Sequence, residues 1–141
     1  MLKYYTIFID GIDKCGKDLI SQYVIKLSNF RYIVNGRGIL SQIAYNHLYN
    51  RQTEYDLTQQ SNFVNVLLDV DENDWKIRCN ITNETSIDYL SNKKAFDYAY
   101  SVMSMFDYPL FRLNTSDCSP YNTAKTIVKL VDSLNNTNNL T

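Results

Sequence analysis

The chain has 141 residues, 45% of them hydrophobic and 21% charged, with a formal net charge of −1 at pH 7. This length and composition predict one globular domain over residues 1–134 and a disordered polar tail at 135–141. The balanced charge argues against a nucleic-acid partner. No run approaches the roughly 20 apolar residues of a membrane helix, which argues against a membrane partner.

The three cysteines, Cys15, Cys79 and Cys118, are odd in number and widely spaced, without a metal-binding or disulfide pattern. They predict free thiols in a reducing, cytoplasmic setting. Tyrosine, with 12 residues, outnumbers glycine, with 4, and asparagine is abundant. This bias is typical of an AT-rich coding genome, such as a viral one, and a viral protein would work in the host cytoplasm.

The first half of the chain alternates between strand and helix patterns. Tyr4–Ile9 is aromatic and β-branched, which favours a strand, and apolar residues then recur at helical spacing over Leu19–Leu27. Phe30–Val34 is a second predicted strand. Ile39–Tyr49 follows as a second predicted helix.

The second half continues the alternation. Phe63–Val70 is almost continuously apolar, as strands of buried parallel sheets are. Acidic residues open a short predicted helix over Asp71–Cys79, and a longer helix is predicted over Ile87–Phe106. Pro109–Leu113 is the fourth predicted strand, and Pro120 opens a final helix that runs to Leu134.

This order predicts a three-layer α/β/α fold in which a mainly four-stranded parallel sheet lies between two layers of helices. Ligands of such sheets bind at the carboxyl ends of the strands. Four loops that contain Gly11, Asn35–Arg37, Asp69–Asp71 and Asn114–Ser119 follow predicted strands. We therefore expect them to meet at one edge of the sheet.

The segment GIDKCGKD at Gly11–Asp18 follows the phosphate-loop pattern G-x-x-x-x-G-K-[ST], except that Asp18 replaces the hydroxyl residue. Glycines let backbone amides approach a phosphate closely, and the start of the following helix adds positive potential. Lys17 would reach the outer phosphates, and Asp18 would bind a metal ion directly or through water. With this loop, the α/β order predicts a fold of the P-loop NTPase type. The expected nucleotide contacts are Gly11, Ile12, Asp13, Lys14, Cys15, Gly16, Lys17, Asp18 and Leu19.

Three segments together resemble thymidylate kinase and the related viral deoxynucleoside monophosphate kinases. Ile9–Lys17 resembles the family's phosphate loop, with an acid before the first glycine and an Asp two residues after it. Arg37–Asn46 (RGILSQIAYN) resembles the family segment D-R-Y-x-x-S-x-x-A-Y-Q. Leu67–Asp71, followed by Arg78, resembles the strand that leads into an arginine-bearing lid.

The resemblance implies transfer of a phosphoryl group from ATP, with Mg²⁺, to a (deoxy)nucleoside monophosphate. It places Asp13 near the acceptor sugar and the metal, Lys17 on the donor phosphates and Arg37 on the acceptor phosphate. It assigns Ser41, Gln42 and Tyr45 to the acceptor pocket and Arg78 to the lid. It also suggests a homodimer formed through helices such as Ile39–Tyr49.

The chain departs from the family at two positions, because Gly36 replaces the Asp before Arg37 and Asp18 replaces a hydroxyl residue. Only 19 residues separate Lys17 from Arg37, too few for the complete acceptor pocket. Two alternatives stay open: a degenerate protein that binds a nucleotide without turnover, and a kinase for a metabolite that is not a nucleotide. Arg37 and Arg78 could also be surface residues, and Tyr45 a core residue.

Overall fold

The computed structural model describes residues 5–12, 15–52, 54, 62–82 and 89–139. Within these residues it has four strands, β1 (Thr6–Gly11), β2 (Ile33–Gly36), β3 (Phe63–Asp69) and β4 (Leu110–Asn114). The helices there are α1 (Lys17–Leu27), α2 (Ile39–Leu48), α3 (Glu72–Thr82), α4 (Tyr89–Met103) and α5 (Pro120–Asn139).

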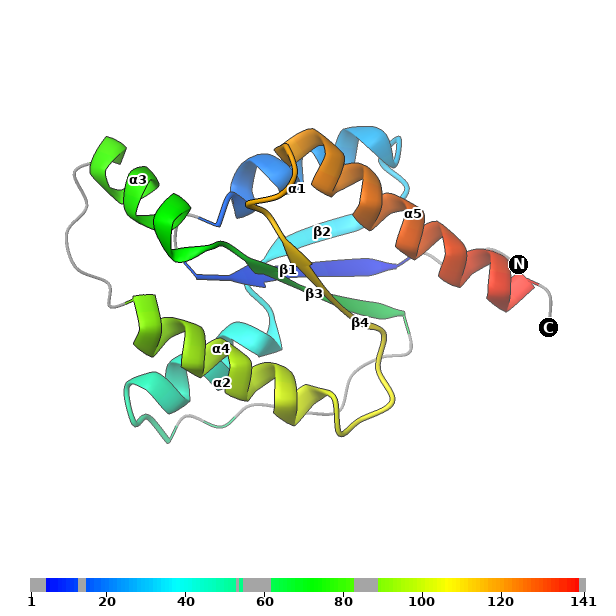
Figure 1. Cartoon of the computed structure of the whole chain (residues 1–141). Helices are drawn as coiled ribbons and strands as arrows, with labels where there is room; N and C mark the ends of the chain where they lie inside the picture. The colour runs from blue at the N-terminus through cyan, green and yellow to red at the C-terminus, as the bar shows by residue number, and fades with distance from the viewer. Residues whose placement is uncertain (1–4, 13–14, 53, 55–61, 83–88, 140–141) are drawn as a thin grey trace.

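The four strands form one parallel sheet in the order β2-β1-β3-β4. Helices α1 and α5 cover one face of the sheet and α2 and α4 cover the other, as Figure 1 shows. This arrangement confirms the predicted three-layer α/β fold. None of the described helices is long and apolar enough to cross a membrane.

The core lies on both faces of the two central strands. Val64 and Val66 of β3 face one side of the sheet and Asn65 and Leu67 face the other, and all four are fully buried because helices cover both faces. Burial on both faces explains why β3 has a nearly continuous apolar sequence rather than an alternating one. The burial of the central strands therefore matches the apolar run from which β3 is predicted.

The second strand begins at Ile33, three residues after the predicted start at Phe30. Helix α1 ends in a turn in which Asn29 and Phe30 have left-handed φ angles of 56° and 59°. The Phe30 N–H donates to the Ile25 carbonyl at 3.0 Å, which satisfies a carbonyl at the helix end. Phe30 thus belongs to the end of the helix, although its aromatic character favours a strand.

The last helix extends past Leu134, where the sequence predicts the domain to end, and continues to Asn139. Asn135, placed in the predicted tail, is buried, and its Nδ2 donates to the hydroxyl of Tyr32 at 3.2 Å. The Tyr32 hydroxyl also contacts the Asp132 carboxylate. A long-range partner therefore orders part of a segment whose polar composition predicts disorder.

A three-residue ionic network ties α4 to the carboxyl edge of the sheet. Arg112 of β4 binds the Asp69 carboxylate through two hydrogen bonds of 2.5 and 2.9 Å, and it also contacts Asp97 of α4. Its guanidinium lies 5.2 Å from the ring centre of Tyr100. Partial burial works to raise the pKa of Asp97, but the Arg112 hydrogen bond and charge, with help from Lys93, hold it below its usual value.

We predict that Arg112→Leu lowers the free energy of unfolding by about 1–2 kcal/mol at pH 7, since it leaves two neighbouring carboxylates without their cation. About a quarter of the Arg112 side chain is exposed, and solvent screening there keeps the loss of stability small. Because the folded-state pKa of Asp97 is lowered, its stabilisation is complete above the unfolded value of about 3.9 and is lost as pH falls through the folded pKa.

Urea titrations of both proteins between pH 3 and pH 7 measure this difference. It should be largest at neutral pH and shrink in acid. Lys93→Met is the matched control, because the exposed Lys93–Asp97 pair at 3.3 Å should contribute less than about 0.5 kcal/mol. If Arg112→Leu and Lys93→Met lowered the free energy of unfolding equally, the stabilising role of the network would be contradicted.

Candidate functional site

The predicted phosphate loop joins the end of β1 to the start of α1. Gly16 occupies the N-cap position of α1 with a left-handed φ of 91°, a conformation that glycine adopts without strain. The Ile20 N–H donates to the Gly16 carbonyl at 3.1 Å, so the helix begins directly after the loop. Asp13 and Lys14 lie outside the described residues, and their contacts stay predictions.

Gly11 and Cys15 pack against each other at the base of the loop. A Cβ on Gly11 would lie 2.7 Å from the Cys15 Sγ and 2.7 Å from the Leu68 carbonyl oxygen, so a larger residue does not fit. Burial raises the pKa of the Cys15 thiol to about 11, despite the nearby charge of Lys17. The thiol is therefore protonated and fills space, as expected for a residue without a nearby base.

Lys17 extends from the first turn of α1 toward the end of β2. Its Cδ and Cε lie 3.8 Å from the position that a Cβ would take on Gly36. The lysine stem therefore lies beside Gly36, the residue that precedes Arg37. Gly36 leaves room for a side chain at ordinary contact distance, so lack of space does not explain the glycine at this position.

Arg37 lies in the turn between β2 and α2 with an unusual backbone conformation. Its φ is 71°, in the left-handed region, and its N–H donates to the Ile9 carbonyl at 3.1 Å. Its Nη1 donates to the Tyr45 hydroxyl at 2.9 Å, and the Tyr45 ring packs edge-on against Phe96 of α4. The two predicted acceptor residues, Arg37 and Tyr45, are thus in direct contact.

Asp10 organises the start of α2 from the neighbouring strand. Its Oδ1 accepts hydrogen bonds from the Gly38 N–H at 2.6 Å, the Ser41 N–H at 3.2 Å and the Ser41 hydroxyl at 2.5 Å. Burial raises the pKa of Asp10, and the hydrogen bonds from Ser41 and Gly38 oppose that shift. Ser41, which the resemblance places in the acceptor pocket, is itself buried, whereas Gln42 is exposed.

Helix α3 carries Arg78 to the phosphate loop. The helix projects from the end of β3 (Figure 1), and Trp75 anchors it against the Tyr89 ring at 5.7 Å between ring centres. The Arg78 Nη1 lies 4.0 Å from the position of a Cβ on Gly16. The structure therefore brings this predicted arginine to the loop, and Asp18 and Leu19 are exposed in the first turn of α1.

The loops after β3 and β4 meet at the same edge, as the sequence predicts. The Asn114 Nδ2 donates to the Asp71 Oδ1 at 3.0 Å, and the Asp71 N–H donates to the Ser116 hydroxyl at 2.8 Å. Asp69, at the end of β3, is held by Arg112. No sequence signal pairs Asp69 with Arg112, because the two residues are far apart in the chain.

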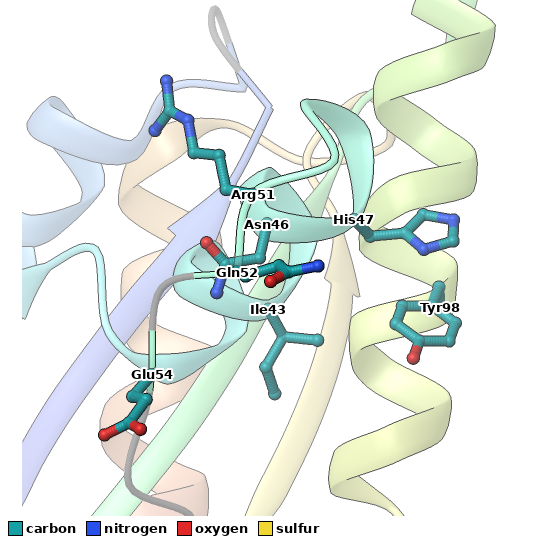
Figure 2. Close-up of a pocket in the computed structure, with 7 residues that line it drawn as sticks. All are labelled: Ile43, Asn46, His47, Arg51, Gln52, Glu54 and Tyr98. Carbon is teal, nitrogen blue, oxygen red and sulfur yellow. The ribbon is translucent and has the colours of Figure 1, made fainter.

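A cavity of about 510 Å³ lies elsewhere, near the carboxyl end of α2, as Figure 2 shows. The His47 ring stacks on Tyr98 at its side, with 4.2 Å between ring centres. None of the predicted phosphate contacts lines it; its lining residues are Ile43, Asn46, His47, Arg51, Gln52, Glu54 and Tyr98. The described residues contain no cluster of three potential metal ligands among His, Cys, Asp and Glu.

The left-handed backbone of Arg37 should affect the stability of substitutions at this position. Because φ is positive there, Arg37→Gly should be more stable than Arg37→Ala by about 1 kcal/mol, although both variants lose the same side-chain contacts. Chemical denaturation measured by circular dichroism gives the comparison. An alanine variant as stable as the glycine variant would show that the left-handed conformation carries no cost.

Comparisons with known proteins give two structural neighbours. One is a crystal structure of the YorR protein from Bacillus subtilis in complex with phosphorylated GDP, with a TM-score of 0.65, 16% identity, and coverage of 90% of this chain and 95% of that chain. The other is an uncharacterized protein from Eubacterium ventriosum, with a TM-score of 0.51, 10% identity, and coverage of 92% and 99%. No protein-family model and no curated protein matches the sequence. At these identities, the shared feature is the fold.

Proposed function

We propose that the protein transfers a phosphoryl group from ATP to a (deoxy)nucleoside monophosphate bound beside the phosphate loop. The observation that carries this proposal is that three segments with cationic residues lie beside one another at the loop between β1 and α1. The Lys17 stem lies beside Gly36, Arg37 follows Gly36 directly, and the Arg78 guanidinium lies beside Gly16. Phosphoryl transfer depends on positioned cations around spread negative charge rather than on a strong nucleophile.

Each group has a separate task in this proposal. The first amides of α1 and Lys17 bind the outer phosphates of the donor. Arg37 leaves the Tyr45 hydroxyl to bind the acceptor phosphate, for which its paired N–H donors are suited. Arg78, which lies beside Gly16 of the loop, neutralises the negative charge of the transferred phosphoryl group. The Tyr45 ring, supported by Phe96, borders the acceptor.

The residues of the loop are compatible with Mg²⁺. This ion takes one or two carboxylates together with phosphate oxygens and water, so it does not require a cluster of protein ligands. Asp18, exposed on the first turn of α1, and Asp13 would hold it. When bound, the ion would neutralise phosphate charge. The bound phosphorylated GDP of the YorR structure supports a nucleotide as the ligand class.

A second candidate function is nucleotide binding without turnover, as a sensor or partner-binding module. Two observations favour it: Gly36 leaves the position beside Lys17 without a carboxylate, and Asp18 adds negative charge where the pattern has a hydroxyl. Both candidates require the same phosphate loop. They differ in whether a diphosphate product forms.

In the decisive experiment, the protein is incubated with ATP, Mg²⁺ and each nucleoside monophosphate in turn, and the products are separated by chromatography. We expect a diphosphate from at least one acceptor.

Calorimetry with ATP should show that Lys17→Met weakens binding by about tenfold or more, since a charged contact to phosphate is lost. Lys26→Met, on the exposed last turn of the same helix, should bind ATP normally.

For the acceptor, Arg37→Ala should reduce turnover by about 100-fold, because it removes the cation that positions the attacking phosphate. Arg51→Ala is the matched control, since Arg51 also lies over a tyrosine ring, at 4.9 Å from the centre of Tyr49, but lines the separate cavity. ATP binding without product from any acceptor would select the second candidate. No binding of ATP, GTP or any nucleoside monophosphate would reject both candidates.

A further inference from the structure

The start of α2 lacks a capping side chain of its own. Gly38 occupies the N-cap position and makes no side-chain hydrogen bond. A Cβ on Gly38 would lie 2.8 Å from the Cβ and Cγ of Phe8, closer than real Cβ contacts. The usual capping residues, Ser, Thr, Asp and Asn, therefore do not fit at this position.

The missing cap comes from the end of β1. The Asp10 carboxylate accepts from the Gly38 and Ser41 amides, which are among the first free N–H groups of the helix, and from the Ser41 hydroxyl. The helix start also favours a negative charge. Asp10 directly precedes Gly11, the first residue of the phosphate loop. One carboxylate therefore connects the phosphate loop to α2.

This connection holds Arg37 from both sides. The Arg37 N–H donates to the Ile9 carbonyl at 3.1 Å, and the next N–H, that of Gly38, donates to Asp10 at 2.6 Å. The left-handed conformation of Arg37 lies between these two attachments to β1. Such a conformation persists only where surrounding contacts determine it.

The second carboxylate oxygen of Asp10 has a different environment. Asp10 is fully buried, and within the described part of the chain its Oδ2 makes no hydrogen bond. The charge of Lys17 acts on the carboxylate and favours its ionised form. A buried oxygen without a partner is costly, which is unusual for a group that only caps a helix.

We propose that Asp10 is a positioning residue that fixes Arg37, through Gly38 and the start of α2, at the distance from the phosphate loop at which donor and acceptor phosphates meet. This inference rests on the proposed function, because it assigns the acceptor phosphate to Arg37. Asp10 itself acts on Arg37 and the helix start, and does not contact the reacting groups.

The first test needs no nucleotide. Amide hydrogen exchange, followed by NMR, compares the wild type with Asp10→Ala and Asp10→Asn. Asp10→Ala should speed exchange at Gly38 and Ser41 by about tenfold or more, because their acceptor is lost. Asp10→Asn retains an oxygen at the same place and should restore much of the protection. Unchanged exchange in Asp10→Ala would overturn the inference.

The second test separates positioning from general damage. Calorimetry with dTMP and with ATP should show that Asp10→Ala weakens dTMP binding by about tenfold or more and ATP binding by less than about threefold. Asn65→Ala, which alters another buried polar residue of the sheet, should affect the two affinities equally. An equal loss of both affinities in Asp10→Ala would overturn the positioning role.

The proposed function can fail separately from this inference. If the wild type binds neither ATP nor dTMP, the kinase proposal is rejected, and the exchange experiment alone decides whether Asp10 fixes the start of α2. If ATP binds and dTMP does not, the same calorimetry is repeated with the monophosphate that gives product. Should no monophosphate bind, the assignment of Arg37 to an acceptor phosphate is wrong.

Discussion

The parallel pairing of β1 with both of its neighbours is the constraint on which the candidate site depends. Ile9 lies opposite Gly36 in β2 and Val66 in β3, so the ends of three strands are fixed relative to one another. The phosphate loop leaves β1 two residues later. Because α1, α2 and α3 all begin at this edge, the segments that carry Lys17, Arg37 and Arg78 start side by side.

The order of strands and helices could be predicted from the sequence because hydrophobic periodicity and burial agree along most of the chain. The errors occur where a long-range contact overrides local preference. Phe30 has the character of a strand residue but ends a helix in a left-handed turn. Asn135 has the character of a disordered residue but is buried against Tyr32. Neither partner is visible in a local window of sequence.

The candidate site could be predicted where the sequence has a local motif, and not where it depends on tertiary contacts. The glycine and lysine spacing indicates a phosphate loop between β1 and α1, whereas the contact of Arg37 with Tyr45, eight residues later, is visible only in the structure. Only the structure reveals that Asp10 accepts from the Gly38 N–H, 28 residues away, and that Phe8 leaves no room for a side chain at position 38. Arg112 likewise finds its carboxylates on two other elements.

Two unfavourable features of this fold occur at the same turn. Arg37 has a left-handed backbone although glycines stand on either side of it, and the Asp10 carboxylate that supports this turn is buried with one oxygen unpartnered within the described residues. Both features lower the stability of the fold. A glycine at position 37 would relieve the backbone strain, and a buried oxygen without a hydrogen bond is unfavourable. Departures from local preference concentrate at sites that bind or react, because stability elsewhere can sustain them. Their occurrence at the turn that carries Arg37 is therefore a physical reason for the proposal that Arg37 serves a ligand.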